Sequence, residues 1–194
     1  AMEAAGKAAN LLGIPVVFDP VAAGGTSLRR AEAARLMRAV HFSVIRGNAS
    51  EIRFLAGEQS SGSGVDAGMF DEITEENLSA AIGIVKGLAE KTGSVIAVSG
   101  RLDLISDSRR TAVLRNGSHV MARITGSGCM LTALTGAFCG ACQKDCFTAA
   151  FAASAVMGVC GELADAKRLE RGTGNASFRN DLIDAVFTLT EKQF

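Results

Sequence analysis

Short apolar runs alternate with longer amphipathic segments along this chain, a pattern that predicts strands separated by helices. Apolar runs at residues 16–18, 42–45 and 94–99 have the length of strands, and the third is apolar enough to be buried on both faces. Two shorter strands are expected at about residues 103–106 and 111–115. The apolar runs therefore predict a sheet of at least five strands.

The pair Asn116-Gly117 is a strong signal for a tight hairpin turn, so residues 119–123 are expected to form a return strand. Helix ends are marked by other residues. Gly13 ends a first helix, Thr26 or Ser27 caps a second, and Thr74 caps a longer one that begins with two acids. The predicted helices cover residues 2–12, 28–39, a short stretch ending near 55, 74–91, 129–142, 146–166 and 178–191.

Strands that alternate with helices predict an α/β fold with a mostly parallel sheet flanked by helices on both faces. The hairpin adds antiparallel pairing near one edge, and a glycine-rich loop is expected over residues 57–70. No linker or repeat divides the chain, so residues 1–194 are interpreted as one domain. Because the first element is a helix, whereas a parallel sheet usually opens with a strand, the first strands of the fold are expected to be missing from this chain.

Composition narrows the class of partner. The 194 residues contain 20 Lys plus Arg and 20 Asp plus Glu, so there is no basic excess to attract nucleic acid or an anionic membrane. Trp and Tyr are absent, which removes the usual base-stacking side chains. Five cysteines form an odd set without a secretory signal, which favours a reduced, cytoplasmic compartment. A small-molecule substrate is the expected partner.

Two uncharged stretches, residues 124–143 and 146–161, raise the alternative of a membrane hairpin. Both are rich in Gly, Ala, Ser and Thr, which favours buried helices of an α/β domain. Cys139, Cys142 and Cys146 lie in this region with no histidine nearby, so they are interpreted as buried structural thiols and not as metal ligands.

The turn Gly126-Ser127-Gly128-Cys129 precedes a predicted helix and is a candidate anion site. Glycines let the backbone approach a ligand closely, and the free N–H groups at a helix start attract a phosphoryl group. Cys129 would lie in the first turn, where the helix dipole favours a thiolate. The alternative is a glycine-rich turn that only packs against the sheet. The turn matches neither a Walker A loop nor a dinucleotide-binding motif.

A second candidate is the run from Arg46 to Glu51, which follows a predicted strand. Asn48 and Glu51 have the spacing of a helix capping box, which is one interpretation. The other is a magnesium site, with Asp19 at the end of the neighbouring strand as a second carboxylate. Arg46 could neutralise a phosphate, or it could be a solvated charge at a strand end.

Taken in order, these motifs resemble those of the hydroxyethylthiazole kinase family of the ribokinase-like superfamily. The resemblance is carried by Asp19-Pro20, the run Arg46-Gly47-Asn48-Ala49-Ser50-Glu51, Ser99-Gly100 and Gly126-Ser127-Gly128-Cys129-Met130, and it extends over almost the whole chain. Most of the superfamily carries aspartate after the second glycine, whereas the thiazole kinases carry cysteine. Cys129 therefore indicates this branch.

The resemblance implies a role for each matching residue. Two positions depart from the family pattern, with Ser99 in place of the usual threonine and Ala22 in place of a glycine. The implied roles are ATP contacts for Arg46 and Ser99, a substrate contact for Gly126, an anion hole for Gly126, Ser127 and Gly128, a catalytic base for Cys129, and magnesium binding for Glu51, Asp19 and Asn48.

The implied reaction is ATP-dependent phosphorylation of the primary alcohol of 4-methyl-5-(2-hydroxyethyl)thiazole, in thiamine biosynthesis or salvage, with Mg²⁺ as cofactor. The family resemblance further implies a cytoplasmic homotrimer with active sites between subunits, and a preceding segment that carries the first strands and part of the thiazole pocket. Two alternatives stay open: a related kinase of the hydroxymethylpyrimidine type, and a nucleotide-binding fragment without turnover.

Overall fold

A computed structural model describes residues 1–57 and 72–189, and most of the predicted loop at 57–70 lies outside these residues. Its centre is a five-stranded sheet in the order β1-β2-β3-β4-β5. The first three strands are parallel and the last two are antiparallel, so the sheet is mixed. The strands are β1 (Val17–Phe18), β2 (Val44–Asn48), β3 (Val95–Ser99), β4 (Asp103–Ser106) and β5 (Thr111–Leu114).

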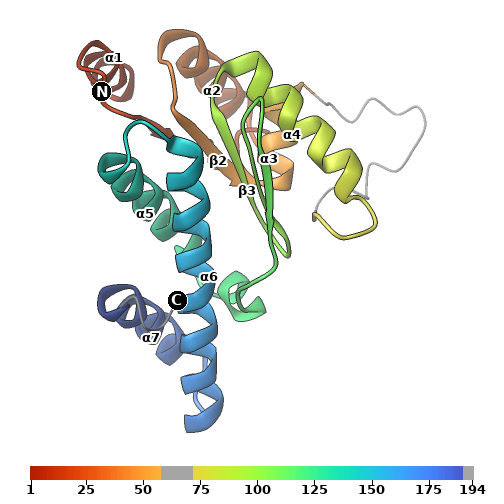
Figure 1. Cartoon of the computed structure of the whole chain (residues 1–194), viewed down its shortest axis with the longest axis vertical. Helices are drawn as coiled ribbons and strands as arrows, with labels where there is room; N and C mark the ends of the chain where they lie inside the picture. Colours follow the sequence, from red (N-terminus) through yellow and green to blue (C-terminus); the bar gives the residue numbers. More distant parts are fainter. Residues whose placement is uncertain (58–71, 190–194) are drawn as a thin grey trace.

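Helices cover both faces of the sheet, as the sequence predicts (Figure 1). Alternate residues of the central strands face opposite sides, because strand side chains have a period of two. Ile45 and Ile96 pack with one group of helices, whereas Val44 and Val95 pack with the other. The first group is α2 (Ser27–Ala39), α3 (Ala49–Ala56) and α4 (Leu78–Thr92), and the second is α5 (Ser127–Ala141) and α6 (Cys146–Arg171).

The remaining helices lie at the margins of this layered core. α1 (Met2–Leu11) packs near α2, and α7 (Asn175–Thr188) packs against α6 beyond the end of the sheet (Figure 1). The α5–α6–α7 contact has its own apolar core, which includes the fully buried Phe178, Leu182 and Cys160. The chain therefore carries the α/β arrangement predicted from the sequence, extended on one side by a small helical layer.

The predicted return strand at residues 119–123 is wrong, because His119–Arg123 forms a 3₁₀ helix. The residues that signalled a hairpin bind α6 instead. Nδ2 of Asn116 donates to the carbonyl of Ala155 at 2.9 Å, and the amide of Gly117 donates to Glu162 at 2.8 Å. The tight hairpin lies earlier, between β4 and β5.

The predicted start of the long helix at Thr74 is also wrong, because α4 begins at Leu78. The side chain of Asn77 folds back: its Oδ1 accepts from the Thr74 amide at 2.8 Å and its Nδ2 donates to the Glu72 carbonyl at 2.9 Å. This turn delays the helix by about one turn. Thr26, by contrast, is confirmed as a cap, since its Oγ1 accepts from the Arg29 amide at 3.2 Å.

Helix α6 is long and apolar enough to cross a membrane by length and composition alone. In the fold, 56% of its most apolar window is buried inside the chain, between the sheet and the neighbouring helices. A core helix of an α/β domain has this pattern, so the composition of α6 is explained by its packing.

Candidate active site

Three of the predicted site segments lie at one edge of the sheet. β1, β2 and β3 are parallel neighbours, and the register pairs Asn48 with Ser99 at their carboxyl ends. Asp19 follows β1 at the same edge. In open α/β sheets this edge is where ligands bind. The structure therefore brings together the three strand-end segments that the sequence singled out.

The fourth segment joins this edge as the start of α5. Gly126 is the N-terminal cap, and its φ of 99° lies in the left-handed region that favours glycine. The first bond of the helix runs from the Met130 amide to the Gly126 carbonyl, at 2.9 Å. The amides of Ser127, Gly128 and Cys129 come before that bond, so they have no carbonyl partner within the helix. This is the geometry of an anion site.

The side chains of this turn differ in their surroundings. Oγ of Ser127 donates to the Met121 carbonyl at 3.0 Å, which fastens the turn to the preceding 3₁₀ helix. The thiol of Cys129 is exposed. The exposed Cys129 therefore lies in the first turn of α5, at the same end of the helix as the free amides.

Arg46 lies beneath this turn with only 4% of its surface exposed. Its Nη1 donates to the Gly128 carbonyl at 2.9 Å and forms an ion pair with Oδ2 of Asp19 at 3.3 Å, while Nη2 donates to the hydroxyl of Ser99. Within the described residues, Nε of Arg46 is buried without a hydrogen-bond partner. The guanidinium thus joins β1, β2, β3 and α5 at one point. The sequence alternative of a solvated strand-end charge is wrong.

The capping box predicted for Asn48 and Glu51 is confirmed. Oδ1 of Asn48 accepts from the Glu51 amide at 2.9 Å, and Oε2 of Glu51 accepts from the Asn48 amide at 2.8 Å. The second carboxylate oxygen, Oε1, accepts from the Ala22 amide at 2.8 Å. Glu51 therefore fixes the start of α3 and also holds the loop that follows β1.

A capping box does not exclude a cation. Each oxygen of Glu51 accepts one amide and keeps a free lone pair, and no described residue donates a hydrogen bond to Oδ1 of Asp19. Oδ1 of Asn48 already accepts two donors, the Glu51 amide and the Ser50 hydroxyl. Among residues 1–57 and 72–189 there is no cluster of three metal-binding side chains. Two carboxylates at this edge of the sheet, beside a candidate anion site, form a donor set that fits Mg²⁺, which normally takes one or two.

Comparison with known proteins shows which family this chain belongs to. The family model described as the hydroxyethylthiazole kinase family matches residues 1–192. The chain belongs to the hydroxyethylthiazole kinase family. It is 46% identical to the hydroxyethylthiazole kinase of Clostridium acetobutylicum over 97% of this chain and 68% of that protein. It is 42% identical to the enzyme of Ruminiclostridium cellulolyticum over 100% of this chain and 68% of that protein.

Solved structures show that this chain has the ribokinase-like fold. The enzyme from Pyrococcus horikoshii OT3 superposes with a TM-score of 0.81 at 31% identity, covering 99% of this chain and 66% of that one. Bacillus subtilis pyridoxal kinase, with a TM-score of 0.51 and 21% identity over 82% of this chain and 58% of that chain, shows the fold alone. The chain is thus a kinase of thiamine metabolism that spans about two thirds of its relatives' length.

Two residues that contact this candidate site were not found from the sequence. Asp103 opens β4 and accepts from the Gly100 amide at 3.0 Å. Burial raises the pKa of its carboxyl to about 6, against the smaller opposing effects of the Gly100 amide and the Arg46 charge. Thr132 donates to Oδ2 of Asp19 at 2.6 Å. An acid three residues after Gly100, and a threonine four residues after Gly128 on the same helix face, were the available signals.

The cysteines near the end of α5 divide into two kinds. Cys139 is buried, as predicted, and burial followed by the neighbouring Cys146 raises its pKa to about 12. Cys146 is half-buried, but Cys142 is exposed, so the prediction of a buried structural thiol is wrong there. Cys142 lies just past the end of α5, where the chain turns towards α6.

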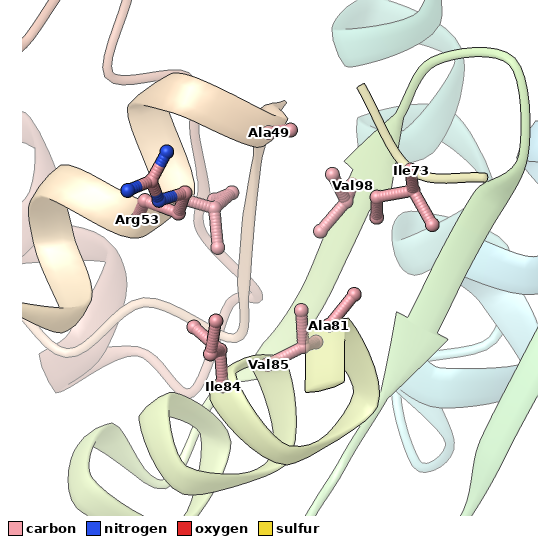
Figure 2. A pocket seen from close by; sticks show the side chains of 8 residues that line it. Ala49, Arg53, Ile73, Ala81, Ile84, Val85 and Val98 are labelled. Carbon is pink, nitrogen blue, oxygen red and sulfur yellow. The ribbon is translucent and has the colours of Figure 1, made fainter. Parts of the chain in front are cut away.

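A separate apolar hollow lies between α3, α4 and β3 (Figure 2). Its lining is almost wholly apolar, with Ile73, Val85 and Val98 among the side chains that point into it. Arg53 also lines the wall. The hollow contains none of the predicted site residues and lies within the main apolar core.

Proposed function

We propose that this chain carries the phosphoryl-transfer site for ATP and the primary alcohol of 4-methyl-5-(2-hydroxyethyl)thiazole, and that the reaction occurs at the first turn of α5. The observation that supports the proposal is a helix start with three amides free of intrahelical bonds, next to an exposed Cys129 and above the buried charge of Arg46. Family membership supplies the acceptor alcohol.

The amides of Ser127, Gly128 and Cys129 would donate to the oxygens of the transferring phosphoryl group, and Gly126 would contact the thiazole alcohol. Phosphoryl transfer passes through a loose transition state, so positioning and charge neutralisation supply most of the rate enhancement. A turn whose backbone is already held by Arg46 and by the Ser127 hydroxyl can offer these donors without rearrangement.

Cys129 would act as the catalytic base that accepts the proton of the alcohol. Its place in the first turn brings the sulfur to the same end of the helix as the phosphoryl-binding amides. A thiolate is a modest base, and the transition state needs little help from one, so its contribution is expected to be about 10²-fold.

Arg46 and Ser99 would serve the nucleotide. Nη1 and Nη2 of Arg46 already donate hydrogen bonds to protein groups. The guanidinium would therefore attract the phosphates of ATP through its positive charge and not through direct hydrogen bonds. Ser99 ends β3 and is followed by the exposed Gly100, and its hydroxyl is held by Arg46. Through Arg46, the Ser99 hydroxyl and the α5 turn would be held together on the same side of the nucleotide site.

Glu51 and Asp19 would hold Mg²⁺, and Asn48 would keep Glu51 in place through the capping box. When bound, Mg²⁺ would neutralise negative charge on the phosphates of ATP. The support from this chain is the free lone pairs on two carboxylates at adjacent strand ends.

We further propose a cytoplasmic homotrimer with active sites between subunits. Large apolar side chains are exposed at Leu11, Leu12 and Leu28 and, on α7, at Phe187, which is 90% exposed. Surface of this kind is what subunit contacts cover. Sedimentation velocity of the full-length protein should give three times the monomer mass, and a monomer at assay concentration would contradict the assembly.

The decisive test of the activity is ADP release by the full-length protein, measured with a coupled assay in the presence of the thiazole alcohol and Mg²⁺. ADP should form only when the alcohol is present. Faster ADP formation with hydroxymethylpyrimidine would indicate the related kinase instead. ADP binding without turnover on either alcohol would indicate a nucleotide-binding protein and refute the kinase proposal.

A further inference from the structure

Thr132 connects α5 to the end of β1. Its hydroxyl lies 2.6 Å from Oδ2 of Asp19, a residue 113 positions earlier in the chain. The same hydroxyl lies 3.1 Å from the Gly128 carbonyl one helical turn back, and Nη1 of Arg46 lies 3.3 Å from its oxygen. The hydroxyl therefore lies between a buried cation and a carboxylate.

The Thr132 hydroxyl has one proton and two acceptors within reach, Oδ2 of Asp19 and the Gly128 carbonyl. The Asp19 carboxylate is both closer and charged, and hydrogen bonds to ionised acceptors are the shorter and stronger ones. Arg46 donates to the Thr132 oxygen from the other side. The direction of donation is therefore from Arg46 to Thr132 to Asp19.

This arrangement orients the carboxylate of Asp19. Its Oδ2 receives Thr132 from α5 and Arg46 from β2, while no residue in the described ranges donates to Oδ1. With Oδ2 held from two elements, rotation of the carboxylate is restricted and Oδ1 stays free of protein donors. A carboxylate fixed in this way offers one defined oxygen to a ligand.

We propose that Thr132 is a positioning residue that fixes the Asp19 carboxylate for Mg²⁺ bound with the nucleotide. This inference rests on the proposed function, because it uses Asp19 as a Mg²⁺ ligand. Thr132 itself touches neither metal nor substrate. Its action passes through Asp19, with the start of α5 and the end of β1 held at a fixed spacing.

A second threonine in the same helix supplies a matched control. Thr135 donates its hydroxyl to the Leu131 carbonyl at 2.8 Å, the ordinary bond of a threonine inside a helix. Thr135 is buried and lies in the next turn of α5. Thr135→Val removes a hydroxyl from the same helix without touching Asp19.

The test compares ADP binding to the full-length protein by calorimetry with and without Mg²⁺. In the wild type, Mg²⁺ should tighten ADP binding. Thr132→Val should reduce that gain about tenfold and leave metal-free ADP binding unchanged, while Thr132→Ser, which keeps the hydroxyl, should restore it. Thr135→Val should behave like the wild type in both conditions.

Among the variants, three results would overturn the inference: an unchanged Mg²⁺ effect in Thr132→Val, an equal loss in Thr135→Val, or a loss in Thr132→Val that is the same with and without metal. Thermal unfolding of each variant separates a folding defect from a binding defect. If the wild type gives the expected Mg²⁺ effect but releases no ADP with the thiazole alcohol, the proposed function falls and Thr132 keeps its role. If Mg²⁺ does not affect ADP binding in the wild type, both fall.

Discussion

Replacement of Asp103 by asparagine should make the chain more stable near neutral pH. Asp103 opens β4, and its Oδ1 accepts from the Gly100 amide at 3.0 Å. Burial raises the pKa of this carboxyl from its ordinary 3.8 to about 6, so the charged form is disfavoured in the folded chain. Asparagine keeps an oxygen for the amide and removes the buried charge.

The size of the effect follows from the two pKa values. A rise from 3.8 to about 6 corresponds to about 3 kcal/mol of stability, present in full below the unfolded pKa and lost as the pH rises through the folded pKa. Between about pH 5 and about pH 8 the titration of this one group should remove roughly 1 kcal/mol from the stability of the wild type. Asp103→Asn cannot lose this contribution, because the amide does not titrate.

The assay is urea unfolding of wild type and Asp103→Asn at several pH values between these limits. The difference in the free energy of unfolding should grow in favour of Asp103→Asn as the pH rises. Asp184→Asn, which removes an exposed carboxylate from α7, is the matched control and should follow the wild type. Parallel pH profiles for wild type and Asp103→Asn would refute the assignment of a buried, protonatable carboxyl.

Substitutions at three further positions test the site and the residues that support it. Cys129→Ala should lower turnover about 10²-fold with ADP affinity unchanged, while Cys129→Asp should keep activity; an aspartate variant as inactive as the alanine variant would contradict the base assignment. Arg46→Met should lower the free energy of unfolding in urea by about 3 kcal/mol, because Asp19 and the Gly128 carbonyl lose their buried partner. A decrease below about 1 kcal/mol would contradict a stabilising role for the Arg46 contacts. Ala22→Gly should raise stability by about 0.5 kcal/mol in the same assay, because Ala22 has a φ of 52°, and a loss of stability would show that this backbone is unstrained.

The sheet was largely predictable because its strands are continuous apolar runs. All five strands were expected near their observed positions, but β2 extends to Asn48, further than its apolar run indicates. Pairing with β3 explains the extension, since the register continues through Gly47 and Val98 to Asn48 and Ser99. The polar residues at the end of β2 adopt strand conformation because they pair with β3, although their intrinsic strand propensity is low.

The error at residues 119–123 has a similar origin. Asn-Gly favours a tight turn wherever it occurs, but the turn type depends on what the flanking residues can pair with. Here Asn116 and Gly117 bond to α6, with Ala155 and Glu162 as partners some 40 positions later. Contacts of that range have no signature in the local sequence.

The site was predicted as a set of residues but not as an arrangement. The motifs placed Asp19 and Arg46 at neighbouring strand ends, and the structure shows that the two are in contact and that Arg46 also reaches the α5 turn. The inward direction of Arg46 and the contact between Thr132 and Asp19 depend on how α5 packs on the sheet. A linear pattern contains the residue types for these contacts and leaves their direction open.

The run from Arg46 to Glu51 shows why a family motif is not a list of ligand contacts. A Cβ at position 47 would lie 2.9 Å from Oε2 and 3.2 Å from Cβ of Glu51, so any larger residue there would displace the carboxylate that folds back over the strand. Asn48 completes the fold-back by capping α3, and Arg46, two residues earlier in the strand, braces the α5 turn. Much of the motif's specificity therefore comes from the close approach of β2, α3 and α5. The motif is needed wherever β2, α3 and α5 must pack this closely to hold Asp19 and Glu51 at adjacent strand ends. Its presence in a sequence therefore indicates the architecture of the site more directly than it indicates the ligand.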